Sequence, residues 1–141
     1  MIRFFGGRVM TLANGIETQD IEVWTEGSKI VFVGKPKAEE LDGKVFEREY
    51  DLKGNLLMPS FKNAHTHSAM TFLRSYADDM PLQDWLFKQI FPMEAKLDGE
   101  KVYWLTKLAI LEYLTTGCTA AFDMYFELDD YVKAVSYTHL R

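Results

Sequence analysis

The chain has 141 residues, about the length of one ordinary domain, and its 48% hydrophobic and 14% aromatic content excludes disorder over the whole length. The formal net charge of −5, with acidic and basic residues intermixed, argues against nucleic acid as a partner, because a phosphate backbone requires a basic face. The single cysteine, Cys118, rules out an intrachain disulfide and favours a cytoplasmic setting, and no segment approaches the roughly 20 apolar residues of a membrane span.

The first 55 residues are expected to form short β-strands separated by turns. Gly6-Gly7 and Asn14-Gly15 are turn signals, and the runs between such signals are rich in β-forming residues. The expected strands cover residues 2–5, 8–11, 21–24, 30–33 and 45–52. The run 30–33 is continuously apolar, which predicts a buried strand, whereas the charged segment 35–44 predicts a loop. Short strands at this spacing indicate part of a small β-sandwich or a small barrel.

Residues 56–134 differ in character, because glycine and proline become sparse and helical patterns begin. An apolar run at residues 56–58 leads into a segment with two histidines. A helix is expected over residues 82–90, where Pro81 suits the first turn. Pro92 is expected to interrupt or restart this helix, because proline lacks a backbone N–H.

A second helix is expected after Asp98, whose side chain suits the N-cap, and before Gly117, which suits a left-handed residue at the helix end. Its apolar positions cover a broad arc, so we expect a well-packed helix. These positions are Val102, Leu105, Ala109, Trp104, Leu108 and Leu111. Residues 118–122 then predict a buried strand that ends at Asp123. A strand, helices and a further strand are the beginning of a parallel α/β layout.

The main chemical signal is the segment Asn63-Ala64-His65-Thr66-His67. In an extended strand, side chains alternate between faces, so His65 and His67 project to the same side and Thr66 to the other. Two neutral imidazoles on one face are suited to hold one zinc or other first-row metal ion. On these three residues alone, two polar residues in a surface loop would be the favoured interpretation.

The surrounding string restricts the interpretation further. It reads Leu57-Met58-Pro59-Ser60-Phe61-Lys62-Asn63-Ala64-His65-Thr66-His67 and resembles the first metal-binding motif of the amidohydrolase superfamily. The strings Met70-Thr71-Phe72-Leu73-Arg74, Ala77-Asp78-Asp79, Trp85-Leu86-Phe87, Gly117-Cys118-Thr119 and Asp123-Met124-Tyr125 resemble its branch of 5-methylthioadenosine/S-adenosylhomocysteine deaminases and related chlorohydrolases. The chain departs from the motif at Ser60, where glycine is usual, and at Lys62, where an apolar residue is common.

This resemblance implies an α/β fold, the start of a (β/α)8 TIM-type barrel preceded by part of a small β-sandwich, and incomplete in this chain. Its domains would be residues 1–55 for the sandwich part and 56–134 for the first strand–helix portion of the barrel. It further implies one divalent metal ion, with zinc as the expected identity, held in part by His65 and His67. The remaining ligands and the acid–base residues of the family come from later strands.

The implied reaction is deamination of a small adenosine-like nucleoside, of the 5-methylthioadenosine or S-adenosylhomocysteine type, by metal-bound hydroxide, with ammonia leaving. Glu94 matches the glutamate that holds the ribose hydroxyls in nucleoside deaminases, and an ordinary exposed glutamate beside Lys96 is the alternative. Trp85 is either a wall of the pocket or a core residue. A homo-oligomer of the complete protein is compatible with the sequence.

Three alternatives stay open. The complete protein is a chlorohydrolase or another amidohydrolase acting on C–N or C–Cl bonds, the chain by itself is a non-catalytic stub, or it is a β-rich interaction domain with incidental histidines. Residues 135–141 stop resembling the family and look like the conceptual translation of a transposon-end adapter used in DNA library preparation. We therefore expect a non-native tail there rather than a genuine short loop, and His139 is not counted as a ligand.

Overall fold

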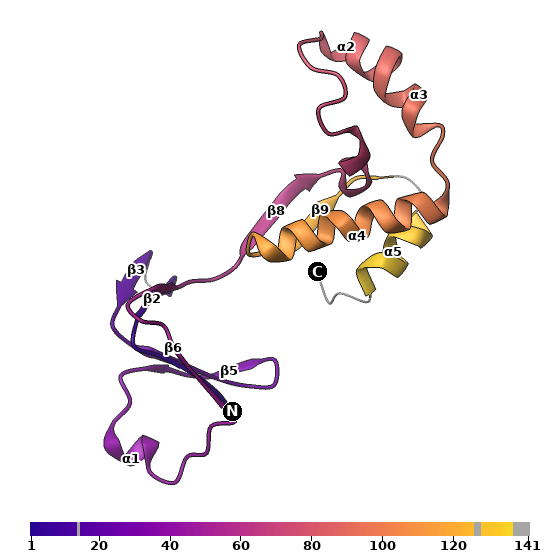
Figure 1. Cartoon of the computed structure of the whole chain (residues 1–141). Helices are drawn as coiled ribbons and strands as arrows, with labels where there is room; N and C mark the ends of the chain where they lie inside the picture. Colours follow the sequence, from indigo (N-terminus) through magenta and orange to yellow (C-terminus); the bar gives the residue numbers. More distant parts are fainter. Residues whose placement is uncertain (14, 126–127, 137–141) are drawn as a thin grey trace. The chain divides into compact units, whose positions relative to one another are not determined.

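The computed structural model describes residues 1–13, 15–125 and 128–136, and it divides into two compact units, Met1–Pro59 and Ser60–Arg141. Each unit is described by itself (Figure 1). Among the described residues, no helix has the length and apolar character needed to cross a lipid bilayer.

The first unit consists of short strands in two sheets. One sheet has the order β5-β4-β1-β6 and the other the order β3-β2-β7. The strands are β1 (Ile2–Phe5), β2 (Arg8–Thr11), β3 (Glu17–Gln19), β4 (Glu22–Glu26), β5 (Lys29–Gly34), β6 (Arg48–Asp51) and β7 (Leu56–Leu57). Strand β7 pairs in parallel with β2, so residues 56 and 57, which the sequence pattern placed with the following unit, lie in the first one.

Arg3 of β1 forms the polar centre of the first unit. Its guanidinium donates hydrogen bonds to both carboxylate oxygens of Glu22, at 2.7 and 2.6 Å, and to Glu49 at 2.8 Å. The same guanidinium lies 4.6 Å from the ring centroid of Phe5. Trp24, which is 3% exposed, donates its indole N–H to Glu22 at 2.9 Å. The hydrogen bond from Arg3 lowers the pKa of Glu22, although burial of this carboxyl opposes the shift.

Two expectations for the first unit are wrong. Strand β5 lies at the edge of its sheet and is not a buried strand, because Ile30 is 67% and Val31 49% exposed. Only Phe32 of its apolar run is covered on one face, where it stacks on Trp24 with centroids 4.1 Å apart. The expected loop 35–44 contains one helical turn, α1 (Ala38–Leu41).

The second unit begins with β8 (Phe61–Thr66), which pairs in parallel with β9 (Cys118–Asp123). Between these strands the chain forms the 3-10 helix η1 (Ser68–Leu73), α2 (Leu82–Asp84), the π-helix η2 (Trp85–Ile90), α3 (Phe91–Glu94) and the long helix α4 (Gly99–Thr115). Helix α5 (Leu128–Ser136) follows β9. Figure 1 shows α4 lying along β8 and β9, with α5 beside it, and Ile110 and Ala134 form a buried cluster between these two helices.

The expected ends of the long helix are confirmed. Asp98 caps α4 by accepting a hydrogen bond from the backbone N–H of Lys101 at 3.0 Å, and Gly117 follows the helix with φ +81°. The expectation of a broad buried arc is wrong for half of that arc. Val102 and Ala109 are buried, whereas Trp104 and Leu111 are both 59% exposed in the described part of the chain.

Helical structure covers residues 82–90 as expected, and Pro92 lies where a new helical segment begins, which is the expected restart. Helical structure runs from Leu82 through the π-helical turn η2 into α3, and Pro92 lies in the first turn of α3. A π-helix bonds residue i to i+5, so the backbone N–H of Phe91 reaches the carbonyl of Leu86. The missing donor of Pro92 therefore falls where regular α-helical bonding is already interrupted.

Candidate metal and substrate site

The two histidines of the predicted metal site lie at the carboxyl end of β8. The ring centroids of His65 and His67 are 4.9 Å apart, and the ring planes are nearly perpendicular at 85°. His65 is exposed and His67 is half-buried, whereas the hydroxyl of the intervening Thr66 points to a different partner, Tyr113. This proximity is compatible with two nitrogen ligands for a single cation.

The protonation pattern of His67 follows from its hydrogen bond. Its Nδ1 lies 2.7 Å from the backbone carbonyl oxygen of Met124. Because a carbonyl only accepts, Nδ1 carries the proton and the lone pair of Nε2 is left for a ligand. Metal-binding histidines typically donate their second ring N–H in this way, so the donor set fits a zinc or related ion.

His67 is also fixed through its neighbours along the chain. It is the one residue between the end of β8 at Thr66 and the start of η1 at Ser68. The Thr66 carbonyl accepts a hydrogen bond from the backbone N–H of Met124 at 3.1 Å. The Ser68 backbone N–H donates to both carboxylate oxygens of Asp123, at 3.1 and 3.3 Å. The end of β9 therefore holds both peptide groups that flank His67.

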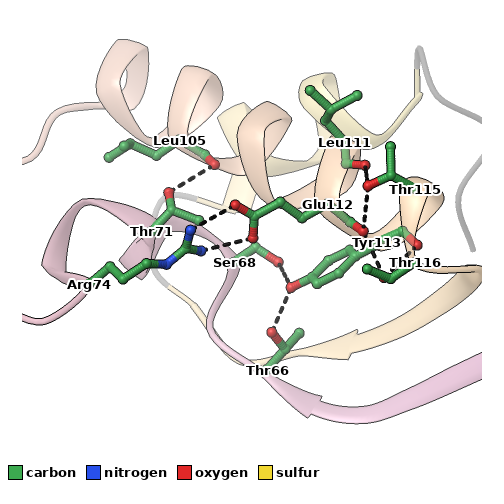
Figure 2. A network of polar contacts seen from close by, with 10 residues as sticks. All are labelled: Thr66, Ser68, Thr71, Arg74, Leu105, Leu111, Glu112, Tyr113, Thr115 and Thr116. Atoms are coloured by element: carbon green, nitrogen blue, oxygen red, sulfur yellow. Dashed lines mark hydrogen bonds and ion pairs between the residues drawn. The ribbon is translucent and has the colours of Figure 1, made fainter.

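A phenol from α4 completes this arrangement, as Figure 2 shows. The hydroxyl of Tyr113 lies 2.6 Å from the Thr66 hydroxyl and 2.9 Å from the Ser68 hydroxyl. Ser68 is 2% exposed, so its hydroxyl depends on partners within the protein. The sequence pattern gave neither Tyr113 nor Ser68 a role at the site. Tyr113 and Thr66 are 47 residues apart in sequence, and only the packing of the chain brings their hydroxyls together.

Two further contacts tie η1 to α4. Arg74, which follows η1, donates two parallel hydrogen bonds to Glu112, at 2.9 and 2.8 Å, and this fork lowers the pKa of the Glu112 carboxyl (Figure 2). The Thr71 hydroxyl donates to the carbonyl of Leu105 at 3.2 Å. Both contacts hold the segment that leaves His67 against the helix that carries Tyr113.

A cavity of about 410 Å³ opens beside His67. Its polar lining comes from His67, Glu94 and Tyr125. The apolar lining comes mainly from the helical segments that precede α4, namely Met70, Trp85, Leu86, Ile90 and Phe91, together with Met124. The cavity therefore places the predicted substrate-binding Glu94 beside one of the predicted metal ligands, and it gives Trp85 the position of a pocket wall, one of its two expected positions.

Glu94 and Tyr125 form the second polar pair of this cavity. Glu94 is half-buried, and its neighbour Lys96 contacts the sulfur of Met93. Burial raises the pKa of the Tyr125 phenol, and its interaction with the Glu94 carboxylate and the charge of Asp123 raise it further. The phenol therefore stays protonated beside the Glu94 carboxylate. The sequence pattern included Tyr125 only as part of a family string and gave it no role.

Other candidates stay apart from this site. Within the described ranges there is no group of three or more histidine, cysteine, aspartate or glutamate side chains arranged to hold a metal ion. Cys118 is buried with a free thiol, as expected for a packing residue. Asp78 and Asp79 do not line the cavity. His139 lies outside the described residues, as does most of the expected tail 135–141.

Residues 56–138 match the model of the amidohydrolase family. Among curated relatives, the 5-methylthioadenosine/S-adenosylhomocysteine deaminase of Syntrophomonas wolfei is 48% identical over 103 residues, which is 70% of this chain and 24% of that protein. The 5'-deoxyadenosine deaminase of Methanospirillum hungatei is 54% identical over 91 residues, or 64% of this chain and 20% of that protein. The chain thus spans about a quarter of the length of these relatives.

Solved structures resemble the chain over nearly its whole length. An adenosine deaminase from Xanthomonas campestris with bound zinc matches with a TM-score of 0.91 at 32% identity, over 99% of this chain and 32% of that one. A zinc-bound atrazine chlorohydrolase from Arthrobacter aurescens matches with a TM-score of 0.85 at 21% identity, over 100% of this chain and 34% of that one. The second likeness concerns the fold alone. Together they confirm the expected α/β class.

Proposed function

The chain belongs to the amidohydrolase family, as its histidine motif predicted, and we propose that the protein carrying it is a metal-dependent hydrolase that deaminates an adenosine-like nucleoside. The substrate class we favour is 5-methylthioadenosine or S-adenosylhomocysteine, which are named in relatives at 43% to 53% identity. The observation that carries the proposal is the shared cavity of His67 and Glu94, whose lining holds both an imidazole with a free Nε2 lone pair and a carboxylate.

We propose a separate role for each of the site residues. His65 and His67 are proposed to hold one divalent ion, most simply zinc, which when bound lowers the pKa of its water to about 7 and supplies hydroxide at neutral pH. The Met124 carbonyl keeps the Nε2 lone pair of His67 available throughout. Glu94 offers two acceptor oxygens to the two adjacent ribose hydroxyls, and the protonated phenol of Tyr125 is proposed to donate to this carboxylate and hold it in place.

The apolar side chains have a separate task. Trp85, Leu86 and Phe91 give a purine ring flat or apolar contacts and exclude bulk water from the reacting carbon. The net reaction replaces the exocyclic amino group with oxygen from water, and ammonia leaves. The groups that transfer protons to and from the ring are proposed to come from parts of the family's barrel that this chain does not span.

The finer architecture is part of the same proposal. The parallel strands β8 and β9, joined through α4, fit the first unit of a (β/α)8 barrel, and the histidines lie at the carboxyl end of β8, where such barrels carry their sites. The strands of residues 1–55, joined by β7, fit part of a composite β-sandwich, and the remainder of residues 56–134 fits the barrel portion. Residues 135–141 are proposed to be a non-native tail. The single cysteine fits a cytoplasmic protein.

A chlorohydrolase is the second candidate. The cavity is lined mostly by apolar side chains, and such a lining also accepts a chlorinated heterocycle. The 141 residues by themselves are proposed to be inactive. Two histidines leave half of a tetrahedral zinc shell without protein ligands, and the described residues offer no larger cluster.

Release assays on the complete protein decide between these candidates. The zinc-loaded protein is incubated with 5-methylthioadenosine, S-adenosylhomocysteine, adenine and chlorinated triazines, and ammonia and chloride are measured. We expect ammonia from both nucleosides and far less from adenine, which lacks the ribose that Glu94 would hold. Chloride release without ammonia release would contradict the deaminase proposal and favour the chlorohydrolase.

A further inference from the structure

The hydroxyl of Tyr113 occupies a particular place relative to the predicted metal ligand His67. It contacts the side chains of the residue before and the residue after His67, Thr66 at 2.6 Å and Ser68 at 2.9 Å. A single phenol from α4 therefore contacts the side chains of both sequence neighbours of His67, as Figure 2 shows for Thr66 and Ser68.

The bonding capacity of a phenol matches this position. A tyrosine hydroxyl has one proton to donate and lone pairs to accept, and threonine and serine hydroxyls have the same. Tyr113 can thus donate to one of its two neighbours and accept from the other, and both contacts are satisfied without any charged group. A neutral anchor adds no positive charge that would repel a cation bound by the nearby imidazoles.

The backbone on either side of His67 leaves this segment few alternatives. The Thr66 carbonyl accepts from Met124, and the Ser68 N–H donates to the Asp123 carboxylate. These bonds fix the segment toward β9, and the phenol fixes it toward α4. The backbone of His67 is neither a strand nor a regular helix, with φ −133° and ψ +78°, so its ring direction depends on these flanking contacts.

We infer that Tyr113 is a positioning residue for metal binding, one that sets the direction of the His67 imidazole through the hydroxyls of Thr66 and Ser68. This inference rests on the proposed metal site at His65 and His67. Outer partners that orient a metal-binding histidine typically change metal affinity by about 10- to 100-fold when they are removed. Tyr113 contacts the neighbours of His67 rather than its ring, so we expect its removal to lower metal affinity about tenfold, at the lower end of this range.

The test uses the complete protein and zinc itself as the probe. Zinc affinity is measured by competition with a chelator, and the visible spectrum is recorded after replacement of zinc by cobalt. Tyr113→Phe is expected to weaken zinc binding about tenfold and to change the cobalt spectrum. Thr66→Val is expected to do the same, and Thr66→Ser, which keeps the hydroxyl, to restore both readouts.

Tyr103→Phe is the matched control, because Tyr103 lies on the same helix and makes ring contacts with Trp104 and Lys107. It is expected to leave zinc affinity and the cobalt spectrum unchanged. A Tyr113→Phe protein that melts at a lower temperature but keeps its zinc affinity and cobalt spectrum would show a structural role only and overturn the inference.

His67→Ala separates this inference from the function on which it rests. If His67→Ala lowers zinc affinity and Tyr113→Phe does not, the metal site stands and the role of Tyr113 is wrong. If zinc affinity survives His67→Ala, the proposed metal site itself is wrong, and the role of Tyr113 with it. A loss in both variants, with Tyr103→Phe unchanged, supports both.

Discussion

The two units of the chain are organised around different kinds of polar centre. In the first unit, the charged Arg3 joins Glu22 and Glu49 and lies over an aromatic ring. In the second, the neutral phenol of Tyr113 joins two hydroxyls beside His67. Ionised hydrogen bonds are about twice as strong as neutral ones, which suits a small sheet that lacks a large core. Neutral bonds suit the surroundings of a cation, where a fixed positive charge would compete.

The largest expected effect is a loss of zinc affinity at the proposed metal site. His65→Ala in the complete protein is expected to lower zinc affinity by more than about a hundredfold, because loss of a ligand exceeds the loss of an outer partner. Metal content after dialysis measures it. Lys62→Met is the matched control, since Lys62 lies in the same strand and contacts Ser60 and Thr119 at its other end. Equal zinc content in both variants would contradict the proposed ligand.

Glu94→Gln tests the far side of the cavity. A hydrogen bond to a charged group contributes about 1.5–3 kcal/mol, so we expect the KM for 5-methylthioadenosine to rise about 10- to 100-fold with zinc content unchanged. Steady-state ammonia release measures the change. Glu100→Gln, an exposed glutamate in the first turn of α4, is the control. An unchanged KM would assign Glu94 to the alternative of an ordinary surface residue.

Arg3→Met tests the charged centre. It leaves the half-buried Glu22 without its main partner, so we expect a loss of about 1–3 kcal/mol in the local stability of the first sheet. Hydrogen exchange of the β1 and β4 amides measures this loss. Arg8→Met is the control, because its ion pair with Asp20 is exposed and should contribute less than about 0.5 kcal/mol. A change in zinc affinity in Arg3→Met would break the separation between the two centres.

Lowering the pH is expected to reduce the stability that the Arg3–Glu22 pair gives to the first sheet, by a smaller amount than Arg3→Met. The pKa of Glu22 is lower in the folded protein than its ordinary value of 4.5, because Arg3 donates to its ionised form. The stabilisation is therefore fully present above pH 4.5 and is lost as the pH falls through the lower folded value. An NMR titration of the Glu22 carboxyl should have its midpoint below 4.5, and Arg3→Met should raise that midpoint. An unchanged midpoint would contradict the assigned cause.

Tyr125→Phe should have the smallest effect. A neutral donor to Glu94 contributes about 0.5–1.5 kcal/mol, so we expect the KM for 5-methylthioadenosine to rise about two- to tenfold, with kcat little changed. In a Glu94→Gln background the same change should have less effect, because the two side chains act together. Fully additive effects would show that the phenol acts on the substrate independently of Glu94.

The sequence predicted best what depends on neighbouring residues. The cap at Asp98, the left-handed Gly117 and the end of β9 at Asp123 are local features, and all three are confirmed. The resemblance to the amidohydrolase family is also confirmed. It could be predicted because the histidine motif is a contiguous string of residues. The placement of Glu94 as a substrate residue stays a prediction, although the fold brings it to the cavity of His67.

Features that depend on packing were not predictable in the same way. The apolar run of β5 indicated burial, but burial requires a covering layer, and Ile30 is exposed in the described structure. The roles of Tyr113 and Tyr125 depend on contacts across 47 residues, to Thr66, and across the cavity, to Glu94. A local sequence pattern reveals neither role, since a tyrosine on a helix or after a strand can as well be a core residue.

The π-helical turn at Trp85–Ile90 carries one more consequence. Bonding from residue i to i+5 brings Trp85 near Ile90 and Leu86 near Phe91, and all four residues line the cavity. In an ordinary α-helix, which turns by about 100° per residue, side chains five residues apart would point about 140° away from one another. The wide turn therefore lets both pairs of side chains line one cavity, and the number of residues in this turn helps to set the composition of that lining.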